Sequence, residues 1–188
     1  MGILRPQQPH NPNTINDLTQ AAFLEGASFV VYTAQMRSLF KSYPHLKPMD
    51  KYAKKVAQRL FKKYPLWLPY ARIEEHDDQH YLVVAVEAPV NPSKQDLLIS
   101  TYNHEITICF DRHHVHFDRF QTEVFESAVQ NAMNHISKIL LEEYIVGVLI
   151  EDGKYKMARL YTPQTIERIK PNEISYMRSW LGTFDKHC

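Results

Sequence analysis

The stretch Leu97–Asp118, LLISTYNHEITICFDRHHVHFD, decides the fold of this chain. Its middle alternates strictly, with Ile106, Ile108 and Phe110 on one side and polar or small residues between them, which is typical of a half-buried strand. The apolar run before it is also strand-like. A short polar segment links the two, and Asn103 is the residue there that best tolerates a positive φ. We therefore expect a hairpin whose apolar side is buried.

The same stretch gathers six titratable side chains around and behind this pattern. They are Glu105, Asp111, His113, His114, His116 and Asp118. If the strand continues past the first aspartate, His114 and His116 share one face and His113 lies opposite. These six residues are the candidate binding site. Within it, Asp111 and His116 are expected inside the fold. Among the remaining members, His113 and Asp118 are expected to be exposed.

Four interpretations of this cluster stay open. Metal binding would use two imidazoles at alternate strand positions, but the sequence contains neither the helical spacing of zinc proteases nor a close cysteine pair. Acid–base catalysis uses the same groups, but no nucleophile or cofactor motif accompanies them. A recognition surface and a structural role in capping strand ends need no further motif. These last two are favoured, so we expect no catalytic residue, metal or cofactor.

Length and composition indicate a single soluble domain. The 188 residues are 44% hydrophobic, with 22 basic and 21 acidic side chains. This balance lacks the broad positive charge of nucleic-acid binders, so no nucleic-acid partner is expected. Only two cysteines, Cys109 and Cys188, occur, which favours a reducing compartment. No signal segment or apolar run of about 18 residues is present, so we expect a cytoplasmic protein without membrane contact.

The chain divides into segments by composition. Residues 1–13 are polar and proline-rich and are expected to be disordered or extended. Residues 14–188 are expected to form one domain. Within it, 14–64 is a helical region, 65–161 a sheet-containing core, and 162–188 a C-terminal tail with a short helix.

Beyond the N-terminal segment, two helices have clear signals and a third, short one has a weak signal. Asp50 caps an amphipathic helix that ends near Tyr64. The strongest helical stripe runs from about Gln121 to Glu143. Asn172 is placed to cap a last short helix. The exposed side of the first of these helices is basic, which is more typical of a solvated face than of a contact surface for a nucleic acid or an acidic protein. Its basic residues are Lys51, Lys54, Lys55, Arg59, Lys62 and Lys63.

The strand patterns predict an α+β fold: a mainly antiparallel sheet of about five or six strands, packed against helices, with a helical N-terminal segment. The predicted strands are Arg72–His76, Tyr81–Val86, Leu97–Thr101, Glu105–Asp111, Tyr144–Ile150 and Lys154–Tyr161. Asp152 and Gly153 between the last two are typical of a type I′ turn.

A resemblance covers about half of the chain, from Tyr64 to Tyr161. The matching residues are Thr101, Glu105, Ile106, Thr107, Ile108, Phe110, Asp111, His114, His116 and Phe117, followed by a helix and Glu151-Asp152-Gly153. This phrase resembles small bacterial proteins that are similar to the immunity proteins encoded beside polymorphic or contact-dependent toxins. The chain departs from the phrase by His113 beside His114, and by Cys109 where a small residue is common.

The resemblance implies an immunity protein that binds and neutralises a cognate toxin without chemistry of its own. It also implies that Glu105, Asp111, His114 and His116 form a recurrent polar cluster. The alternative is a metal-dependent hydrolase or other small enzyme that uses the two histidines and a carboxylate. Self-association into a homo-oligomer stays open.

Overall fold

The structure is a computed structural model, and it describes residues 43–46, 48–89, 96–118, 124–170 and 173–187. All of the described residues belong to one compact unit. The predicted extended N-terminus and the first part of the predicted helical region lie outside the described residues, up to position 42. The division of the chain into three regions therefore stays a prediction.

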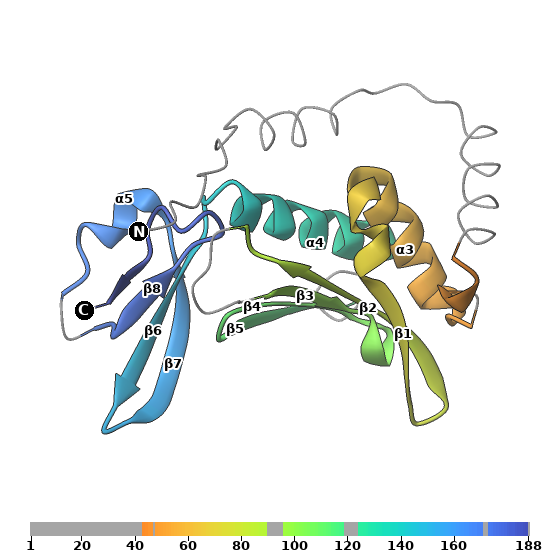
Figure 1. The fold of residues 1–188 in the computed structure, drawn as a ribbon, viewed down its shortest axis with the longest axis horizontal. Coiled ribbons are helices and arrows are strands. Elements are labelled where there is room, and N and C mark those ends of the chain that lie inside the picture. Colours follow the sequence, from red (N-terminus) through yellow and green to blue (C-terminus); the bar gives the residue numbers. More distant parts are fainter. Residues whose placement is uncertain (1–42, 47, 90–95, 119–123, 171–172, 188) are drawn as a thin grey trace, which may run out of the picture. The chain divides into compact units, whose positions relative to one another are not determined.

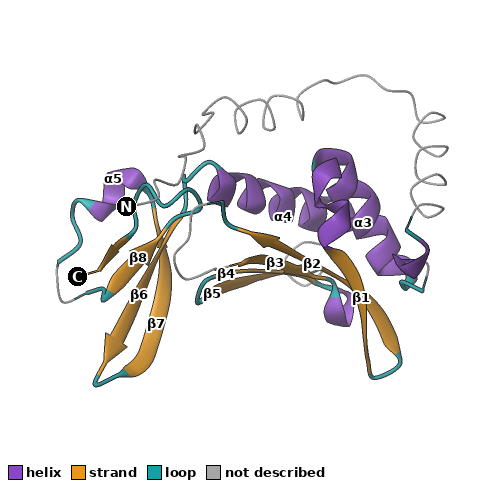
Figure 2. Cartoon of the chain, viewed as in Figure 1, coloured by secondary structure: helices purple, strands orange, loops and turns teal. Residues whose placement is uncertain are grey.

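The α+β class is confirmed, with helices and two antiparallel sheets (Figures 1 and 2). The first sheet has five strands in sequence order: β1 Ala71–His76, β2 Gln79–Glu87, β3 Asp96–Ser100, β4 Ile106–Phe110 and β5 His113–Phe117. The second has the order β7-β6-β8-β9: β6 Ile145–Glu151, β7 Lys154–Tyr161, β8 Tyr176–Arg178 and β9 Lys186–His187. All six predicted strands are present. They divide between two sheets, because alternation within a strand does not determine which strands pair.

Helix α3 (Lys51–Lys63) forms where the sequence predicts it, with an N-cap at Asp50 and a buried apolar stripe. The α-helices are α3 Lys51–Lys63, α4 Phe125–Leu140 and the short α5 Pro163–Ile166, and the 3₁₀ turns are η2 Pro44–Leu46, η3 Pro65–Tyr70 and η4 Tyr102–His104. The carboxylate of Asp50 caps α3 by accepting a 2.7 Å hydrogen bond from the backbone N–H of Ala53. The apolar stripe of α3, including Val56 and Leu60, is fully buried.

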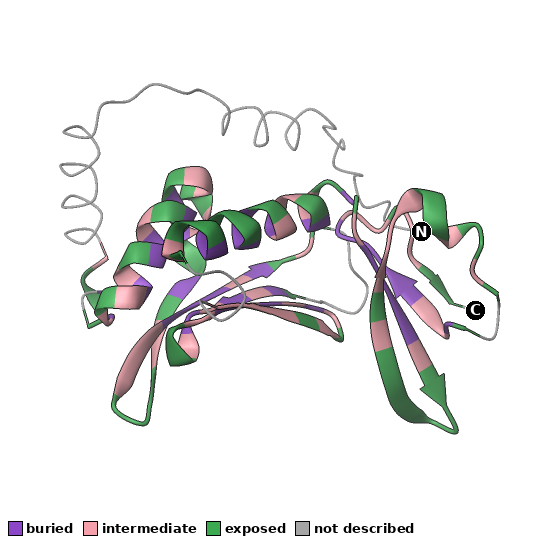
Figure 3. Cartoon of the chain, turned by 180° about the vertical axis from the view of Figure 1, so that it is seen from behind, coloured by how far each residue is buried: buried purple, intermediate pink, exposed green. Residues whose placement is uncertain are grey.

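Helices α3 and α4 lie on the same face of the five-stranded sheet (Figures 1 and 3). The apolar side of β4 points into the core between them, and Ile106, Ile108 and Phe110 are 0–1% exposed, as predicted. Helix α4 packs its stripe, including Ala132 and Ile136, against β4 and β5. No helix in the described part of the chain combines the length and apolar character needed to cross a bilayer.

Aspartate and asparagine form the tight turns of the sheets. Asn103 has φ 56°, and Asp152 and Gly153 have φ 52° and 71°, as a type I′ turn requires. Asp111 has φ 52° and turns the chain back, so that Phe110 pairs with His113. The strand predicted over Glu105–Asp111 therefore ends here and does not persist past Arg112: β4 and β5 form a hairpin. Within β5 the predicted alternation of the three histidines is confirmed.

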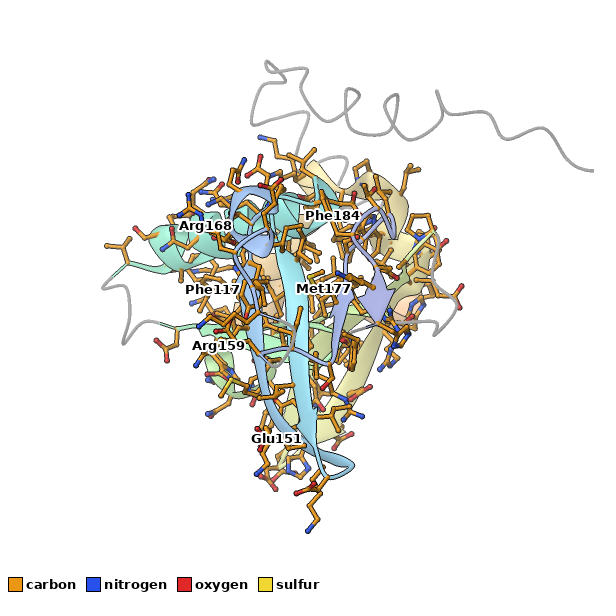
Figure 4. All side chains as sticks on the ribbon, turned by 90° about the vertical axis from the view of Figure 1, so that its left-hand side faces the viewer. Phe117, Glu151, Arg159, Arg168, Met177 and Phe184 are labelled. Carbon is orange, nitrogen blue, oxygen red and sulfur yellow. The ribbon has the colours of Figure 1, made fainter. Side chains whose placement is uncertain are left out.

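The expected helix after Asn172 is also wrong, because this segment forms β8. Ile174 and Met177 are buried against Ile145 in a small core of the second sheet. The N–H of Ser175 donates to the carbonyl of Val148 on β6 over 2.7 Å. The spacing of these apolar residues suits a helix, but pairing with the free edge of β6 is more favourable. It provides this segment with both backbone hydrogen bonds and burial. Figure 4 views this sheet, with Glu151 near the tip of the β6–β7 hairpin.

Candidate functional site

The face of the five-stranded sheet that points away from α3 and α4 holds part of the predicted cluster. Directly paired residues share a face, so the row Arg72, Val83, Ser100, Thr107 and His116 runs across all five strands. Helices α3 and α4 both lie on the other side of the sheet (Figure 1). We call the side that carries this row the open face. Its exposed and half-buried residues are Arg72, Glu74, His76, Gln79, Tyr81, Ala85, Glu87, Asp96, Leu98, Ser100, Glu105, Thr107, Cys109, His114 and His116.

A hydrogen-bonded network of Glu105, Thr107 and His116 lies on the open face. Nδ1 of His116 is 2.7 Å from Oε1 of Glu105, and the Thr107 hydroxyl donates to the same oxygen over 3.2 Å. The ring of His114 meets that of His116 edge to face, with centroids 5.4 Å apart. The His116 side chain is 43% exposed, so the expectation that it lies inside the fold is wrong. The carboxylate fixes the imidazole and leaves Nε2 for a partner.

His113 lies on the other face of β5, so it is separated from the network. It packs towards α4, where its ring stacks on that of His135 with centroids 5.9 Å apart. Its Nε2 atom is buried, and burial is the main cause that lowers its pKa. The expectation of an exposed His113 is therefore wrong. His135 is 22 positions further along the chain, and no sequence pattern relates the two.

Asp111 occupies a third location, at the turn between β4 and β5. Its Oδ1 atom accepts a long hydrogen bond of 3.4 Å from the Tyr176 hydroxyl of β8, which connects the two sheets. Oδ2 is buried without a partner among the described residues. Burial therefore raises the pKa of this carboxyl group, against the opposing effect of the Tyr176 hydrogen bond. Asp111 is half-buried, close to the prediction.

Asp118 follows β5 and is half-buried, not exposed as expected. Its charge acts on Tyr52 in the first turn of α3. The structure adds Tyr52, which the sequence reasoning assigned only to the apolar side of its helix. Burial, followed by the negative charges of Glu105, Asp118 and Asp50, raises the pKa of Tyr52 to about 12. Its hydroxyl therefore stays protonated at neutral pH.

The six predicted residues thus separate into a half-buried network with the exposed His114 beside it, a half-buried histidine that faces α4, an inter-sheet carboxylate and a residue at the sheet end. Within the described ranges, no three His, Cys, Asp or Glu side chains come together in an arrangement that would hold a metal ion. Burial raises the pKa of the Cys109 thiol, which keeps it protonated beside His114.

The open face is acidic, although the whole chain is nearly neutral. It carries the carboxylates of Glu74, Glu87, Asp96 and Glu105 and one guanidinium, Arg72, so its formal charge is −3 with neutral histidines. Glu87 and Asp96 are both exposed and lie directly opposite each other on β2 and β3. Like charges in this position repel. Sequence reasoning missed this pair, since only the strand register brings the two residues together.

No protein-family model, no curated protein and no solved structure matches the chain.

Proposed function

We propose that this protein is an immunity-type binding protein that neutralises a cognate toxin domain inside the cell. The acidic open face supports this proposal most directly. It is a pleated surface of mostly polar side chains, and the His116–Glu105 network lies within it. The partner that fits this surface carries a basic patch.

Charge explains how such a partner would be recognised. Complementary electrostatic potentials on two proteins accelerate their association and disfavour wrong partners. A lysine or arginine of the toxin placed between Glu87 and Asp96 would replace their repulsion with two charge-assisted hydrogen bonds. Nε2 of His116 supplies a further polar contact, in an orientation that Glu105 already fixes. Preorganisation of this kind reduces the entropy that binding costs.

The geometry gives less support to the alternative of a metal-dependent hydrolase. Nδ1 of His116 is already bound to Glu105, and His113 and Asp111 lie at other locations. A protonated Cys109 is a weak nucleophile. The groups of the open face are therefore better suited to recognition than to bond cleavage.

The test begins with the gene adjacent to the one that encodes this chain. Its product is expressed alone and together with this protein, and survival of the cells is measured. Survival only on co-expression supports the proposal, and equal killing in both cultures overturns it.

Binding measurements with purified proteins then test whether the open face contacts the toxin. A double reversal, Glu87→Lys with Asp96→Lys, should weaken toxin binding at least tenfold, as measured by titration calorimetry. The control Glu143→Lys with Glu167→Lys makes the same change of charge at exposed residues outside the five-stranded sheet. If the control weakens binding as much as the first variant, the open face is not the interface.

A further inference from the structure

Three aromatic side chains meet at one end of the open face. Tyr81 of β2 lies directly opposite Glu74 of β1, so both side chains point to this side of the sheet. His76 is two positions further along β1 and shares that side. The ring of Tyr102, from η4, contacts both other rings, with centroids 5.1 Å from that of Tyr81 and 5.4 Å from that of His76. We call Tyr81, Tyr102 and His76 the aromatic corner.

Hydrogen bonds fix the rings of the aromatic corner in place. The backbone N–H of Asn103, in η4, donates to the side-chain oxygen of Gln79 at the start of β2 over 3.0 Å. This contact holds η4, and with it Tyr102, against the β1–β2 hairpin. The Tyr81 hydroxyl donates to the carboxylate of Glu74 over 3.0 Å. The rings are therefore ordered before a partner binds, which reduces the entropy lost on binding.

The aromatic corner is accessible to a partner. Tyr81 and Tyr102 are half-buried, and the His76 side chain is 60% exposed. Strand β3 pairs with β2 only between Val83 and Glu87, so the part of the β1–β2 hairpin that carries the corner extends beyond β3 (Figure 1). Tyrosines in fixed, partly buried positions are typical of the residues that contribute most to binding at protein interfaces.

Negative charge borders the aromatic corner. Asp77 and Asp78 form the turn between β1 and β2, and both are exposed. The carboxylate of Asp77 accepts a long hydrogen bond of 3.4 Å from the Tyr102 hydroxyl and lies 3.4 Å from Nε2 of His76. Its side chain is nevertheless 80% exposed, so its oxygens keep room for further donors. The corner thus combines the faces of aromatic rings with carboxylates at their edge.

We propose that the aromatic corner, together with Asp77 and Asp78, binds an arginine side chain of the partner protein. A guanidinium group is planar, so it stacks on a tyrosine ring while its N–H groups donate to carboxylates beside that ring. A lysine side chain has the same charge, but its ammonium group lacks this planar contact.

The same hairpin contains an internal example of the contact. Arg72 on β1 donates to the carboxylate of Glu74 through Nε over 2.8 Å, and one of its terminal nitrogens lies 2.7 Å from the same oxygen. Glu74 also accepts the hydrogen bond of Tyr81. A guanidinium, a carboxylate and a tyrosine are therefore already combined on the open face, one strand position from the corner.

This inference deepens the proposed function and takes from it the identity of the partner, a toxin domain with a basic patch. The opposed carboxylates of Glu87 and Asp96 attract any basic group. The aromatic corner adds selectivity, because it distinguishes arginine from lysine.

Two other ligands fit the aromatic corner less well. A nucleotide base would also stack on the tyrosines, but the two aspartates would repel its phosphate group. A metal ion requires several ligands from the protein, and the described part of the chain brings no three His, Cys, Asp or Glu side chains into a suitable arrangement.

The test compares two labelled peptides of equal charge, acetylated (Arg-Gly)₆ and (Lys-Gly)₆, by fluorescence anisotropy at 50 mM salt. The wild-type protein should bind the arginine peptide at least about threefold more tightly, which is the scale of one exposed cation–π contact. Tyr81→Leu with Tyr102→Leu should reduce this ratio to about one and change the affinity for the lysine peptide by less than about twofold. The control Tyr70→Leu with Tyr155→Leu removes two exposed tyrosines elsewhere and should keep the wild-type ratio.

A second variant tests the carboxylates without truncating a half-buried ring. Asp77→Asn with Asp78→Asn removes both charges, and asparagine tolerates the positive φ of these positions, 49° and 60°. It should weaken binding of the arginine peptide at least about threefold. Glu151→Gln with Asp152→Asn removes the same charge at the tip of the β6–β7 hairpin and should weaken it by less than about 1.5-fold.

Four results overturn the proposal: no binding of the arginine peptide, equal affinity for the two peptides, an unchanged ratio in the folded tyrosine variant, or an equal loss in either control. If the tyrosine variant does not fold, the asparagine variant and its control decide. None of these measurements requires the toxin. Cells that survive on co-expression, without an arginine preference of the protein, would leave the immunity proposal standing and remove only the arginine site. An arginine preference without protection would remove only the toxin as the partner.

Discussion

The imidazole rings of His113 on β5 and His135 on α4 stack with their centroids 5.9 Å apart and their planes inclined by 21°. Both Nε2 atoms are buried, and neither has a hydrogen-bond partner among the described residues. Phe117 and Tyr144 also contact the ring of His135. Two neutral imidazoles therefore form part of the packing between the sheet and the helix, and a proton on either one would be poorly accommodated.

Acidification should destabilise the protein through this pair. Burial, then the charges of His113 and Lys138, lowers the pKa of His135 to about 4. Between pH 6.5 and 4 the unfolded chain binds a proton that the folded chain does not, so the free energy of unfolding falls as the pH falls. Allowing for partial exposure of the ring, we expect a loss of about 1–2 kcal/mol, measured by urea unfolding.

The variant His135→Gln should lose less stability over this pH range than the wild type. His76→Gln, at an exposed position, should behave as the wild type does. A His135→Gln variant with the wild-type pH dependence would exclude His135 as the cause.

Truncation of Phe110 should be strongly destabilising. The side chain is fully buried, and its ring contacts Trp180 with centroids 5.9 Å apart. Phe110→Ala should therefore lower the free energy of unfolding by about 3–5 kcal/mol, because a cavity remains. Tyr155→Ala, at a 51% exposed position on β7, should change it by less than about 1 kcal/mol. Similar losses in both variants would contradict the described core.

Two substitutions of Asp111 should have opposite effects. Asparagine tolerates the positive φ of this turn and carries no charge, so Asp111→Asn should be at least as stable as the wild type at pH 7. The advantage should shrink as the pH falls through the raised pKa of Asp111, because the wild-type carboxyl group then becomes neutral as well. Alanine is strained at φ 52°, so Asp111→Ala should cost about 1–2 kcal/mol. Thermal melts at pH 7 and 4 test both expectations.

The network on the open face should matter for binding more than for stability. His114→Ala with His116→Ala removes two exposed or half-exposed rings and leaves the apolar side of β5 unchanged. We expect weaker toxin binding, mainly through faster dissociation, and a melting temperature within about 3 °C of the wild type. A variant that melts much earlier would assign the network a structural role instead.

The metal-dependent alternative makes a different prediction for the same double variant. If the alternative is correct, purified protein contains stoichiometric zinc, and the double variant loses it. We expect less than one-tenth of an equivalent in both proteins by elemental analysis, because Nδ1 of His116 is held by Glu105.

Sequence reasoning succeeded where the determinants are local. The cap at Asp50, the positive φ of Asn103 and the turn at Asp152-Gly153 each depend on a few neighbouring residues. It ended the strand at Asp111 but did not predict the hairpin there, because Asp-Arg is a weak turn signal and an alternating strand pattern continues on both sides of it. It failed at Ile174 and Met177 because their spacing suits a helix, whereas pairing with β6 determines their conformation.

The candidate site could be predicted only in part, for a similar reason. Alternation correctly separated His113 from His114 and His116, since this separation is a property of one strand. The pairing of Glu87 with Asp96 depends on register across a loop, and the contact of His113 with His135 depends on helix packing. Neither has a signature in a single sequence. The family resemblance likewise stays a prediction.

The carboxylate of Glu142, just after α4, has a consequence for the order in which the protein folds. The side chain is 6% exposed and accepts hydrogen bonds from the backbone N–H groups of Leu181 and Thr183, which lie 39 and 41 positions further along the chain. The five-stranded sheet, in contrast, is built from hairpins between neighbours in sequence, which close short loops and form quickly. The second sheet has to close a much longer loop before Glu142 can be buried, at a greater entropic cost. We therefore expect its formation to be the slower step of folding.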